Sequence, residues 1–411
     1  MRKMKAFGEA NMKSRLLSAA LAACVVLLAA PASAQGVKIG ILNDQSGVYA
    51  DYGGKWSFEA AKMAIEDFGG SVLGQKIEIV SADHQNKPDL GVSIARRWYE
   101  VEGVDMITEL TTSSVALAIH ELSKQVKKID IVVGAASSRL TGDACQPYGF
   151  HWAYDTHALA FGTGGALVDA GGDTWFFLTA DYAFGYALEK DTGDFVKAKG
   201  GKVLGSVRVP LNSSDFSSFL LQAQSSKAKI IGLANAGLDT TNSIKQAAEF
   251  GIVRSGQKLA GLLLVASDVH GLGLEAAQGL VLTEGYYWDR DDKSRELANR
   301  FFARTGRMPN MIQAGTYSAT LQYLKAVKAA GTKDTEAVAR KLKELPVDDQ
   351  FAQGGKVLEN GRMVHDLYLF EVKKPSESKK PWDYYKQLAV VPGDKAFPSA
   401  KDSGCPLSKG P

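Results

Sequence analysis

Residues 111–114 read Thr-Thr-Ser-Ser and stand directly before a segment, 115–126, whose apolar residues have helical spacing. Side-chain hydroxyls and unpaired backbone N–H groups at a helix N-terminus suit a carboxylate ligand. Ser and Thr are also ordinary helix caps, so plain capping is an alternative interpretation. Because one hydroxyl is enough for a cap, the row of four favours a carboxylate site.

Other loops combine small and aromatic side chains. Residues 134–138 read Gly-Ala-Ala-Ser-Ser, which lets a ligand approach the backbone or simply forms a turn. Residues 181–185 place two aromatic rings beside Asp and Gly, and Tyr49 and Tyr52 form a similar pair. Such rings can enclose an apolar ligand at a cleft, or pack as ordinary core. Later loops offer polar side chains at 235–239 and 267–268.

Motifs for metal binding and catalysis find almost no support in the sequence. The six His are scattered, no His-Glu-x-x-His or zinc-type Cys pair occurs, and Gly-x-Ser-x-Gly is missing. Residues 271–276 match a loose dinucleotide fingerprint, but 266–270 separate them from the preceding strand, so we interpret these glycines as turns. An exported enzyme using Asp181, Asp268 or Glu275 would lack a nucleophile-plus-base arrangement. The sequence therefore predicts no enzyme, no metal and no cofactor.

The charge balance argues against nucleic acid as a partner. The 411 residues contain 48 Lys+Arg and 45 Asp+Glu, a formal net charge of +3. Five basic residues against one acidic residue fall within 1–34, so the rest of the chain carries a formal charge of −1. A nucleic-acid-binding face needs an excess of basic side chains, which this part lacks.

The first 34 residues have the pattern of an export signal. A basic start precedes the apolar run 16–30, and Pro-Ala-Ser-Ala then predicts cleavage after Ala34. A membrane anchor is disfavoured because about 20 apolar residues are needed to cross about 30 Å of hydrocarbon. Leu-Ala-Ala-Cys24 resembles a lipoprotein box, but the apolar run continues past this Cys. A cleaved signal peptide and a lipoprotein signal both predict export, and we expect a periplasmic protein.

Two Cys remain after cleavage, Cys145 and Cys405, each in a turn-like segment. An oxidising compartment favours a disulfide between them, with two independent thiols as the alternative. A disulfide would attach the C-terminal tail to the body of the protein.

The elements that carry these loops alternate between strands and helices. The first series has strands at 37–42, 76–80, 105–108 and 130–133 and helices at 58–67, 92–102 and 115–126. The second has strands at 174–178, 202–209, 229–233 and 259–265 and helices at 186–199, 216–223 and 241–250. Alternation predicts two units with parallel sheets, whose ligands bind beyond the carboxyl ends of the strands.

The remainder of the chain does not form a third unit. It contains two helical segments, 294–305 and 315–330, and a strand pair at 364–372 and 387–391. We infer that the chain crosses between the two units more than once.

Taken together, these segments resemble the periplasmic substrate-binding proteins of branched-chain amino acid ABC transporters, the leucine/isoleucine/valine-binding type. The resemblance covers nearly the whole mature chain through the order and spacing of many weak motifs. These motifs lie at 37–53, 111–114, 135–141, 181–185, 244–251, 277–281 and 316–319.

This resemblance implies an α/β type I periplasmic binding fold, two Rossmann-like lobes with mostly parallel sheets joined by a three-segment hinge. The implied division is a signal peptide at 1–34, an N-terminal lobe of 35–154 plus 286–346, and a C-terminal lobe with the tail of 155–285 plus 347–411. The implied function is binding a small carboxylate-bearing ligand, a branched-chain or related amino acid, for an inner-membrane permease and its ATPase. We expect a monomer.

The resemblance also implies the site residues. The family's carboxylate-binding loop falls on Thr112 and Ser113, its second contact loop on Ala135 and Ser137, and its second-lobe aromatic on Tyr182 or Phe184. From the other loops that follow strands we add Tyr52, Asn235 and Asp268 as candidate ligand-binding residues.

One position departs from the family pattern. The acidic partner for a ligand ammonium should follow Val265, where this sequence has Ala-Ser-Asp and no Glu, so Asp268 or Asp239 would have to replace it. Members of this scaffold also bind aromatic or other organic acids without an amino group, and that alternative stays open. A further alternative is a ligand sensor that presents the same lobes to a receptor.

Overall fold

The first sheet is built by alternating strands and helices in the N-terminal part of the chain. The computed structural model describes residues 36–408, and from Val37 the chain forms one compact unit. The sheet is parallel, with strand order β4-β1-β5-β6-β7. Its elements are β1 (Lys38–Asn43), α2 (Gly54–Phe68), β4 (Glu78–Asp83), α3 (Pro88–Glu100), β5 (Met106–Glu109), α4 (Ser113–Val126), β6 (Ile129–Val132) and β7 (Gly149–His151).

A second parallel sheet follows, with strand order β11-β10-β8-β9. Its elements are β8 (Thr174–Ala180), α7 (Ala183–Ala198), β9 (Lys202–Val209), α8 (Ser217–Ser225), β10 (Ile230–Ala234), α9 (Leu238–Glu249) and β11 (Lys258–Gly261). Helices cover both faces of the central strands, which explains why every residue of β5, β6 and β10 is buried, without alternation.

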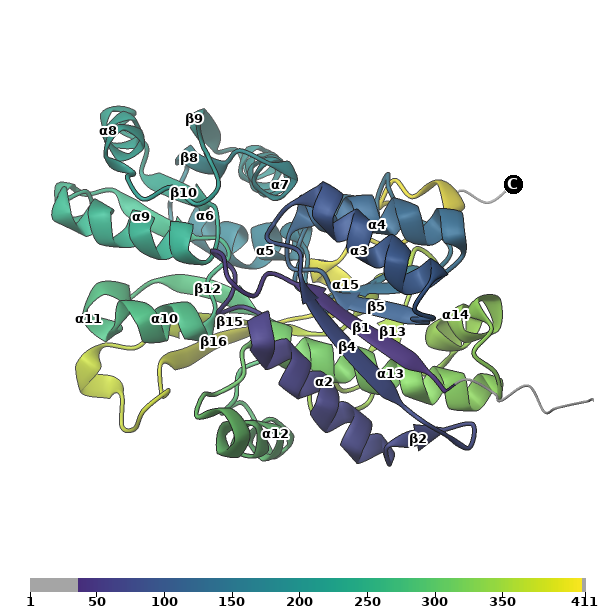
Figure 1. Cartoon of the computed structure of the whole chain (residues 1–411). Helices are drawn as coiled ribbons and strands as arrows, with labels where there is room; N and C mark the ends of the chain where they lie inside the picture. Colours follow the sequence, from purple (N-terminus) through teal and green to yellow (C-terminus); the bar gives the residue numbers. More distant parts are fainter. Residues whose placement is uncertain (1–35, 409–411) are drawn as a thin grey trace, which may run out of the picture. The chain divides into compact units, whose positions relative to one another are not determined.

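The C-terminal third supplies elements to both halves of the molecule (Figure 1). A small antiparallel sheet has the order β12-β15-β16, from β12 (Val281–Glu284), β15 (Leu367–Val372) and β16 (Tyr385–Val391). Between β12 and β15 lie α12 (Asp292–Thr305), α13 (Met311–Ala330) and α14 (Thr335–Glu344), and α13 packs against α2. Three connections therefore join the halves, after β7, after β12 and after α14.

We call the first sheet with α2–α4 and α12–α14 the N-terminal lobe, and the other two sheets with their helices the C-terminal lobe. The mixed α/β fold with two parallel sheets is the predicted fold class. Short elements complete it: β2 (Ser71–Val72), β3 (Gln75–Lys76), α5 (Thr156–Leu159), α6 (Gly165–Asp169), α10 (Ala266–Leu272), α11 (Leu274–Ala277), β13 (Lys356–Val357), β14 (Met363–Val364) and α15 (Gly393–Ala396). No helix among residues 36–408 is long and apolar enough to cross a membrane. The predicted signal peptide and its cleavage after Ala34 lie outside the described residues.

The sequence pattern misplaced some element ends. The strand predicted at 259–265 ends at Gly261, and the apolar residues that follow are buried without strand pairing. An apolar run indicates that a segment is buried, but it does not indicate where strand pairing ends. The helix predicted to begin at Tyr186 begins at Ala183. The short strands β7 and β12 were not predicted.

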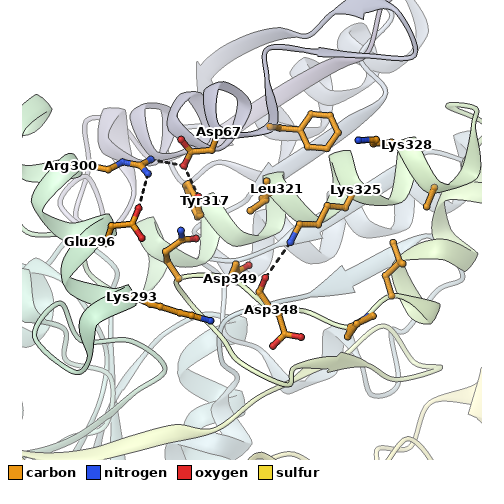
Figure 2. A pocket seen from close by; sticks show the side chains of 15 residues that line it. Asp67, Lys293, Glu296, Arg300, Tyr317, Leu321, Lys325, Lys328, Asp348 and Asp349 are labelled. Carbon is orange, nitrogen blue, oxygen red and sulfur yellow. Dashed lines mark hydrogen bonds and ion pairs between the residues drawn. The ribbon is translucent and has the colours of Figure 1, made fainter.

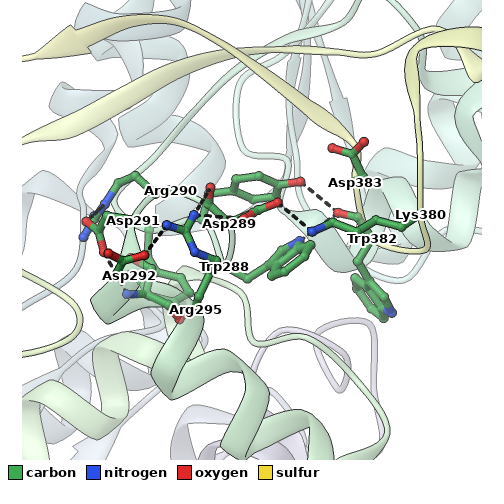
Figure 3. A network of polar contacts seen from close by, with 12 residues as sticks. Trp288, Asp289, Arg290, Asp291, Asp292, Arg295, Lys380, Trp382 and Asp383 are labelled. Carbon is green, nitrogen blue, oxygen red and sulfur yellow. Dashed lines mark hydrogen bonds and ion pairs between the residues drawn. The ribbon is translucent and has the colours of Figure 1, made fainter.

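Polar contacts fix the connection between β12 and α12 to the loop between β15 and β16 (Figure 3). The Tyr287 hydroxyl and Trp288 Nε1 both donate hydrogen bonds of 2.8 Å to the Trp382 carbonyl. Lys380 Nζ lies 3.1 Å from Asp289 Oδ2 and 4.6 Å from the centre of the Trp288 ring. One crossing between the lobes is therefore held against the C-terminal lobe by several independent contacts.

The C-terminal tail is covalently attached to the N-terminal lobe. Cys145, in the segment between β6 and β7, is bonded to Cys405, with their Cα atoms 5.6 Å apart. Both cysteines are buried. Before it reaches Cys405, the tail packs Phe397 over the Arg362 guanidinium, and the Ala396 carbonyl lies 2.8 Å from His157 Nδ1. The tail thus joins β16 of one lobe to a loop of the other.

Removing this bond should destabilise the protein. The bond links residues 260 positions apart, and disulfides that close long loops contribute about 2–4 kcal/mol in typical cases. We expect the Cys145→Ser/Cys405→Ser variant to lose stability of this order in urea unfolding, and reductant to bring the wild type to the same midpoint. The variant itself should not respond to reductant. Equal midpoints for oxidised and reduced wild type would contradict the prediction.

Candidate functional site

The strand order of each parallel sheet creates one point at which neighbouring connections leave toward opposite faces, and ligands bind at such points in open parallel sheets. In the first sheet β1 lies between β4 and β5, so the connections after β1 and β5 diverge to opposite faces. In the second sheet β8 lies between β9 and β10 in the same way. Ligands occupy the crevice beyond the strand ends at such topological switch points.

A cavity lies between the loops of these two switch points. Its volume is about 10 Å³, so the surrounding side chains nearly fill it in this arrangement of the lobes. The N-terminal lobe contributes Tyr49, Tyr52, Thr111, Ser113, Gly134 and Ala136, and the C-terminal lobe contributes Tyr182, Phe184, Ala236 and Leu263. None of these ten residues carries a charged side chain.

The polar end of the cavity is the start of α4. Thr112 is the N-cap residue, but its side chain makes no capping hydrogen bond, and its hydroxyl donates to the Asn86 side chain. The Ser113 hydroxyl accepts from the Ser137 N–H at 3.2 Å and keeps its own proton to donate. The buried Ser137 hydroxyl has no hydrogen-bond partner among the described residues. The hydroxyl row is therefore not used for capping, and the first-turn N–H groups and the Ser113 hydroxyl can serve an anion.

Four aromatic side chains form much of the remaining cavity wall, and two of their hydroxyls meet across the lobes. The hydroxyls of Tyr49 and Tyr182 are 2.6 Å apart, although the two residues belong to different lobes. The Tyr52 ring lies 5.8 Å from the Tyr49 ring, and the Phe184 ring lies 6.0 Å from the Tyr182 ring. Burial raises the pKa of both Tyr49 and Tyr182, so these hydroxyls stay protonated.

Tyr52 forms a second contact between the lobes. Its hydroxyl donates to Asp268 Oδ2 at 2.7 Å and accepts from the Gly237 N–H at 2.9 Å. Asp268 also accepts from the Val265 N–H at 3.0 Å, as an acid in the first turn of a helix does. Burial raises the pKa of Asp268 to about 7. The side chain expected to meet a ligand ammonium is thus bound within the protein and does not line the cavity.

The two other polar candidates in the C-terminal lobe are also bound within that lobe. The Asn235 side chain donates to the Ser243 hydroxyl at 3.0 Å and accepts from the Thr240 hydroxyl at 2.8 Å. Asp239 Oδ2 accepts from the Asn212 N–H at 3.0 Å, and its buried Oδ1 has no hydrogen-bond partner in the described part of the chain. Burial raises the pKa of Asp239 to about 6.

The structure brings together some of the predicted site residues and not others. Four of them line the cavity: Tyr52, Ser113, Tyr182 and Phe184. Four belong to the same loops one position away from a lining residue: Thr112, Ala135, Ser137 and Asn235. Asp268 makes its contacts outside the cavity lining. Leu263 gave no sequence signal, because it belongs to the apolar run that was predicted as strand.

A larger hollow lies elsewhere and fits a binding site less well (Figure 2). Its volume is about 1210 Å³, and its lining comes from the C-terminal end of α2, from α12 and α13, and from the segment after α14. Several of its charged groups are already bound within the protein: Arg300 pairs with Asp67 and Glu296, and Lys325 donates to the Asp348 carbonyl. Across residues 36–408, no group of three or more His, Cys, Asp or Glu is placed to hold a metal ion.

We expect Tyr52→Phe to weaken the contact between the lobes. The change leaves the buried Gly237 N–H without its acceptor and removes one donor from Asp268, which typically costs about 1–3 kcal/mol. Tyr148→Phe is the matched control, because its hydroxyl bonds an exposed Glu336 at 3.2 Å. Urea unfolding should show a clear loss in the free energy of unfolding for Tyr52→Phe. For the control, this free energy should change by no more than about 0.5 kcal/mol. Equal losses would contradict the assigned role of the Tyr52 hydroxyl.

Comparisons with known proteins agree with this architecture. A family model described as periplasmic binding protein matches residues 36–379. A periplasmic binding protein structure from Burkholderia mallei is 56% identical, with a TM-score of 0.89, and the match covers 90% of this chain and 99% of that chain.

Two further relatives carry amino acid names. A branched chain amino acid ABC transporter periplasmic ligand-binding protein from Burkholderia xenovorans LB400 is 41% identical, with a TM-score of 0.81, covering 91% of this chain and 100% of that chain. The Leu/Ile/Val-binding protein homolog 6 of Brucella melitensis biotype 1 is 25% identical over 366 residues, 85% of this chain and 91% of its own length. The resemblance stated from the sequence is confirmed. The chain belongs to the periplasmic binding protein family, the substrate-binding components of ABC transporters, which are not enzymes.

Proposed function

We propose that the cavity binds a small organic acid with an uncharged and preferably aromatic body, and that the protein delivers it to an inner-membrane permease and its ATPase. The observation that supports this proposal is the lining of the cavity. It has helix N–H groups and hydroxyls at one end, aromatic and small apolar residues around the rest, and no charged side chain. Such a lining offers a carboxylate several donors while giving an apolar body a dry surface.

The absence of an acid from the lining favours a ligand without an ammonium group. A buried ammonium needs a charged or several neutral acceptors, since burying an unpaired charge is costly. Asp268 is the residue that the family pattern assigns to this task, but it accepts its hydrogen bonds from Tyr52 and the Val265 N–H. The uncharged lining therefore supports the organic acid.

The cavity has little free space in this arrangement of the lobes. Its volume is about 10 Å³, room for no more than about one water molecule. The Tyr49 and Tyr182 hydroxyls lie 2.6 Å apart across the two lobes. We infer that a small solute enters when the lobes open and is held when they close on it.

A branched-chain amino acid is the second candidate, on two observations. Asp239 carries a buried oxygen without a partner among the described residues and lies close enough to Tyr49 and Tyr182 to raise their pKa. A rotation of this side chain would supply an acceptor for an ammonium. The 41% identical relative is named for branched-chain amino acids.

The proposed setting is the periplasm, reached through the signal peptide that ends at Ala34. The ligand stabilises the closed form by contacting both lobes, and a permease then recognises that form. A ligand sensor would use the same closure. A permease gene next to the gene for this chain would support import, and a sensor kinase gene would support sensing.

A thermal-shift screen of the exported protein tests the ligand class. Ligand at about 100 times its Kd adds about 2.7 kcal/mol of stability, which raises the Tm measurably. We expect benzoate and 4-hydroxybenzoate to raise the Tm and leucine, isoleucine and valine to leave it unchanged. Stabilisation by the amino acids alone would overturn the organic acid and support the second candidate.

A variant pair then locates the site. Ser113→Ala removes one hydroxyl at the start of α4 and should weaken benzoate binding by roughly tenfold, the effect of one hydrogen bond to a charged group. Ser225→Ala changes the same side chain at an exposed position of α8 and serves as control. Isothermal titration should separate the two variants. Equal affinities would place the carboxylate elsewhere.

A further inference from the structure

Glu109 is a buried acid directly behind the cavity wall. It ends β5, its side chain is fully buried, and no ion pair among the described residues includes it. Its backbone φ is +81° and that of Leu110 is +55°, a left-handed turn that two consecutive non-glycine residues rarely adopt. Strained backbone of this kind is concentrated at functional sites.

The Glu109 carboxyl touches the cavity wall through Thr111. Its Oε2 lies 2.6 Å from Thr111 Oγ1, and Thr111 lines the cavity. The surrounding space is tight: a Cβ added at Gly53 would lie 1.7 Å from Oε1, and one added at Gly134 would lie 3.1 Å from it. The carboxyl is thus closely packed against the Gly53 and Gly134 backbones and bonded to the Thr111 hydroxyl.

Burial and one nearby negative charge favour the neutral form of this carboxyl. The Asp44 carboxylate, which follows β1, raises the pKa of Glu109 electrostatically. Hydrogen bonds from Thr111, Asn43 and Ser57 favour the ionised form but are outweighed by burial. Burial thus raises the pKa of Glu109 to about 8.

The protonation state of Glu109 decides where the Thr111 proton points. Thr111 Oγ1 already accepts from the Asp44 N–H at 3.4 Å and has one further lone pair and one proton. An ionised Glu109 takes that proton and leaves a lone pair toward the cavity. A protonated Glu109 donates to the lone pair instead, and the Thr111 proton is then free to reach an anion in the cavity.

We propose that Glu109 is a positioning residue that stays protonated in the complex, donates to Thr111 Oγ1, and so directs the Thr111 hydroxyl toward the ligand's carboxylate. This role rests on the proposed function, because it requires an anionic ligand beside Thr111. Ionisation of Glu109 turns the Thr111 hydroxyl proton away from the ligand. It also places a negative charge behind Thr111, close to the ligand's own carboxylate. Carboxylate binding is therefore linked to one proton on Glu109.

The test measures benzoate affinity of the exported protein at pH 7 and pH 9.5 by isothermal titration. For one linked proton with a pKa of about 8, the wild type should lose roughly thirtyfold in affinity across this range. Glu109→Gln keeps a donor for Thr111 and cannot ionise. The ratio of its benzoate affinities at the two pH values should therefore be close to one. Thr111→Val, which removes the relaying hydroxyl, should also reduce the ratio.

Glu284→Gln is the matched control. Glu284 is equally buried, and burial raises its pKa to about 8, but its hydrogen-bond partner is Tyr385 and it does not line the cavity. This variant should keep the wild-type ratio. A wild-type ratio near one with benzoate still bound would overturn the role of Glu109 and leave the proposed function intact. Failure of every carboxylate to bind at either pH would overturn the proposed function itself.

A ligand-free measurement checks the protonation of Glu109 independently. An acid whose pKa is raised from 4.5 to about 8 on folding binds its proton in the native state and releases it in the unfolded state between these values. The free energy of unfolding then falls as pH rises from about 4.5 to about 8. Glu109→Gln should show a shallower fall than the wild type. Identical slopes would overturn the proposal.

Discussion

The structure depends on one topological constraint, the position of β1 and β8 inside their parallel sheets. Connections that leave adjacent parallel strands toward opposite faces open a crevice where backbone N–H groups and loop side chains have no strand partner. Each lobe has one such crevice, and the lobes place the two face to face. Nine of the ten residues that line the cavity follow β1, β5, β6, β8 or β10, and Leu263 follows β11, so the chemistry of the site is the chemistry of these loops.

Contacts within the protein hold the two lobes together. The Tyr52 hydroxyl binds Asp268 and the Gly237 N–H, and the Tyr49 and Tyr182 hydroxyls bind each other. Asn310, at the start of α13, adds hydrogen bonds to the Tyr52 carbonyl and to Ser267. A ligand shifts the equilibrium only by its differential affinity for the closed form. These tyrosine contacts reduce the free energy of closure that a ligand has to supply. A small solute with few polar atoms would then be enough.

The sequence predicted the alternating fold and the loops of the site, because apolar periodicity and turn residues are local signals. It could not predict which hydroxyl of the Thr-Thr-Ser-Ser row faces the cavity. The row directly follows the left-handed backbone of Glu109 and Leu110, which the residue types do not signal. It also could not predict that Asp268 turns back to Val265 and across to Tyr52, since that geometry depends on the other lobe. Local patterns locate the loops, and tertiary contacts decide which atoms remain free.

An uncharged cavity can recognise a carboxylate only if its dipoles are not opposed by nearby charge. The unpaired N–H groups at the start of α4 and the hydroxyls beside them supply partial positive charge without a cation. In a buried site such partial charges act more strongly than in water, and so does any ionised acid among them. Glu109 lies one hydroxyl away from this end of the cavity. Burial keeps Glu109 neutral at moderate pH. The N–H and hydroxyl donors at the start of α4 therefore make the electrostatic potential at this end of the cavity positive. The same acid, once ionised, would oppose the ligand that those donors attract.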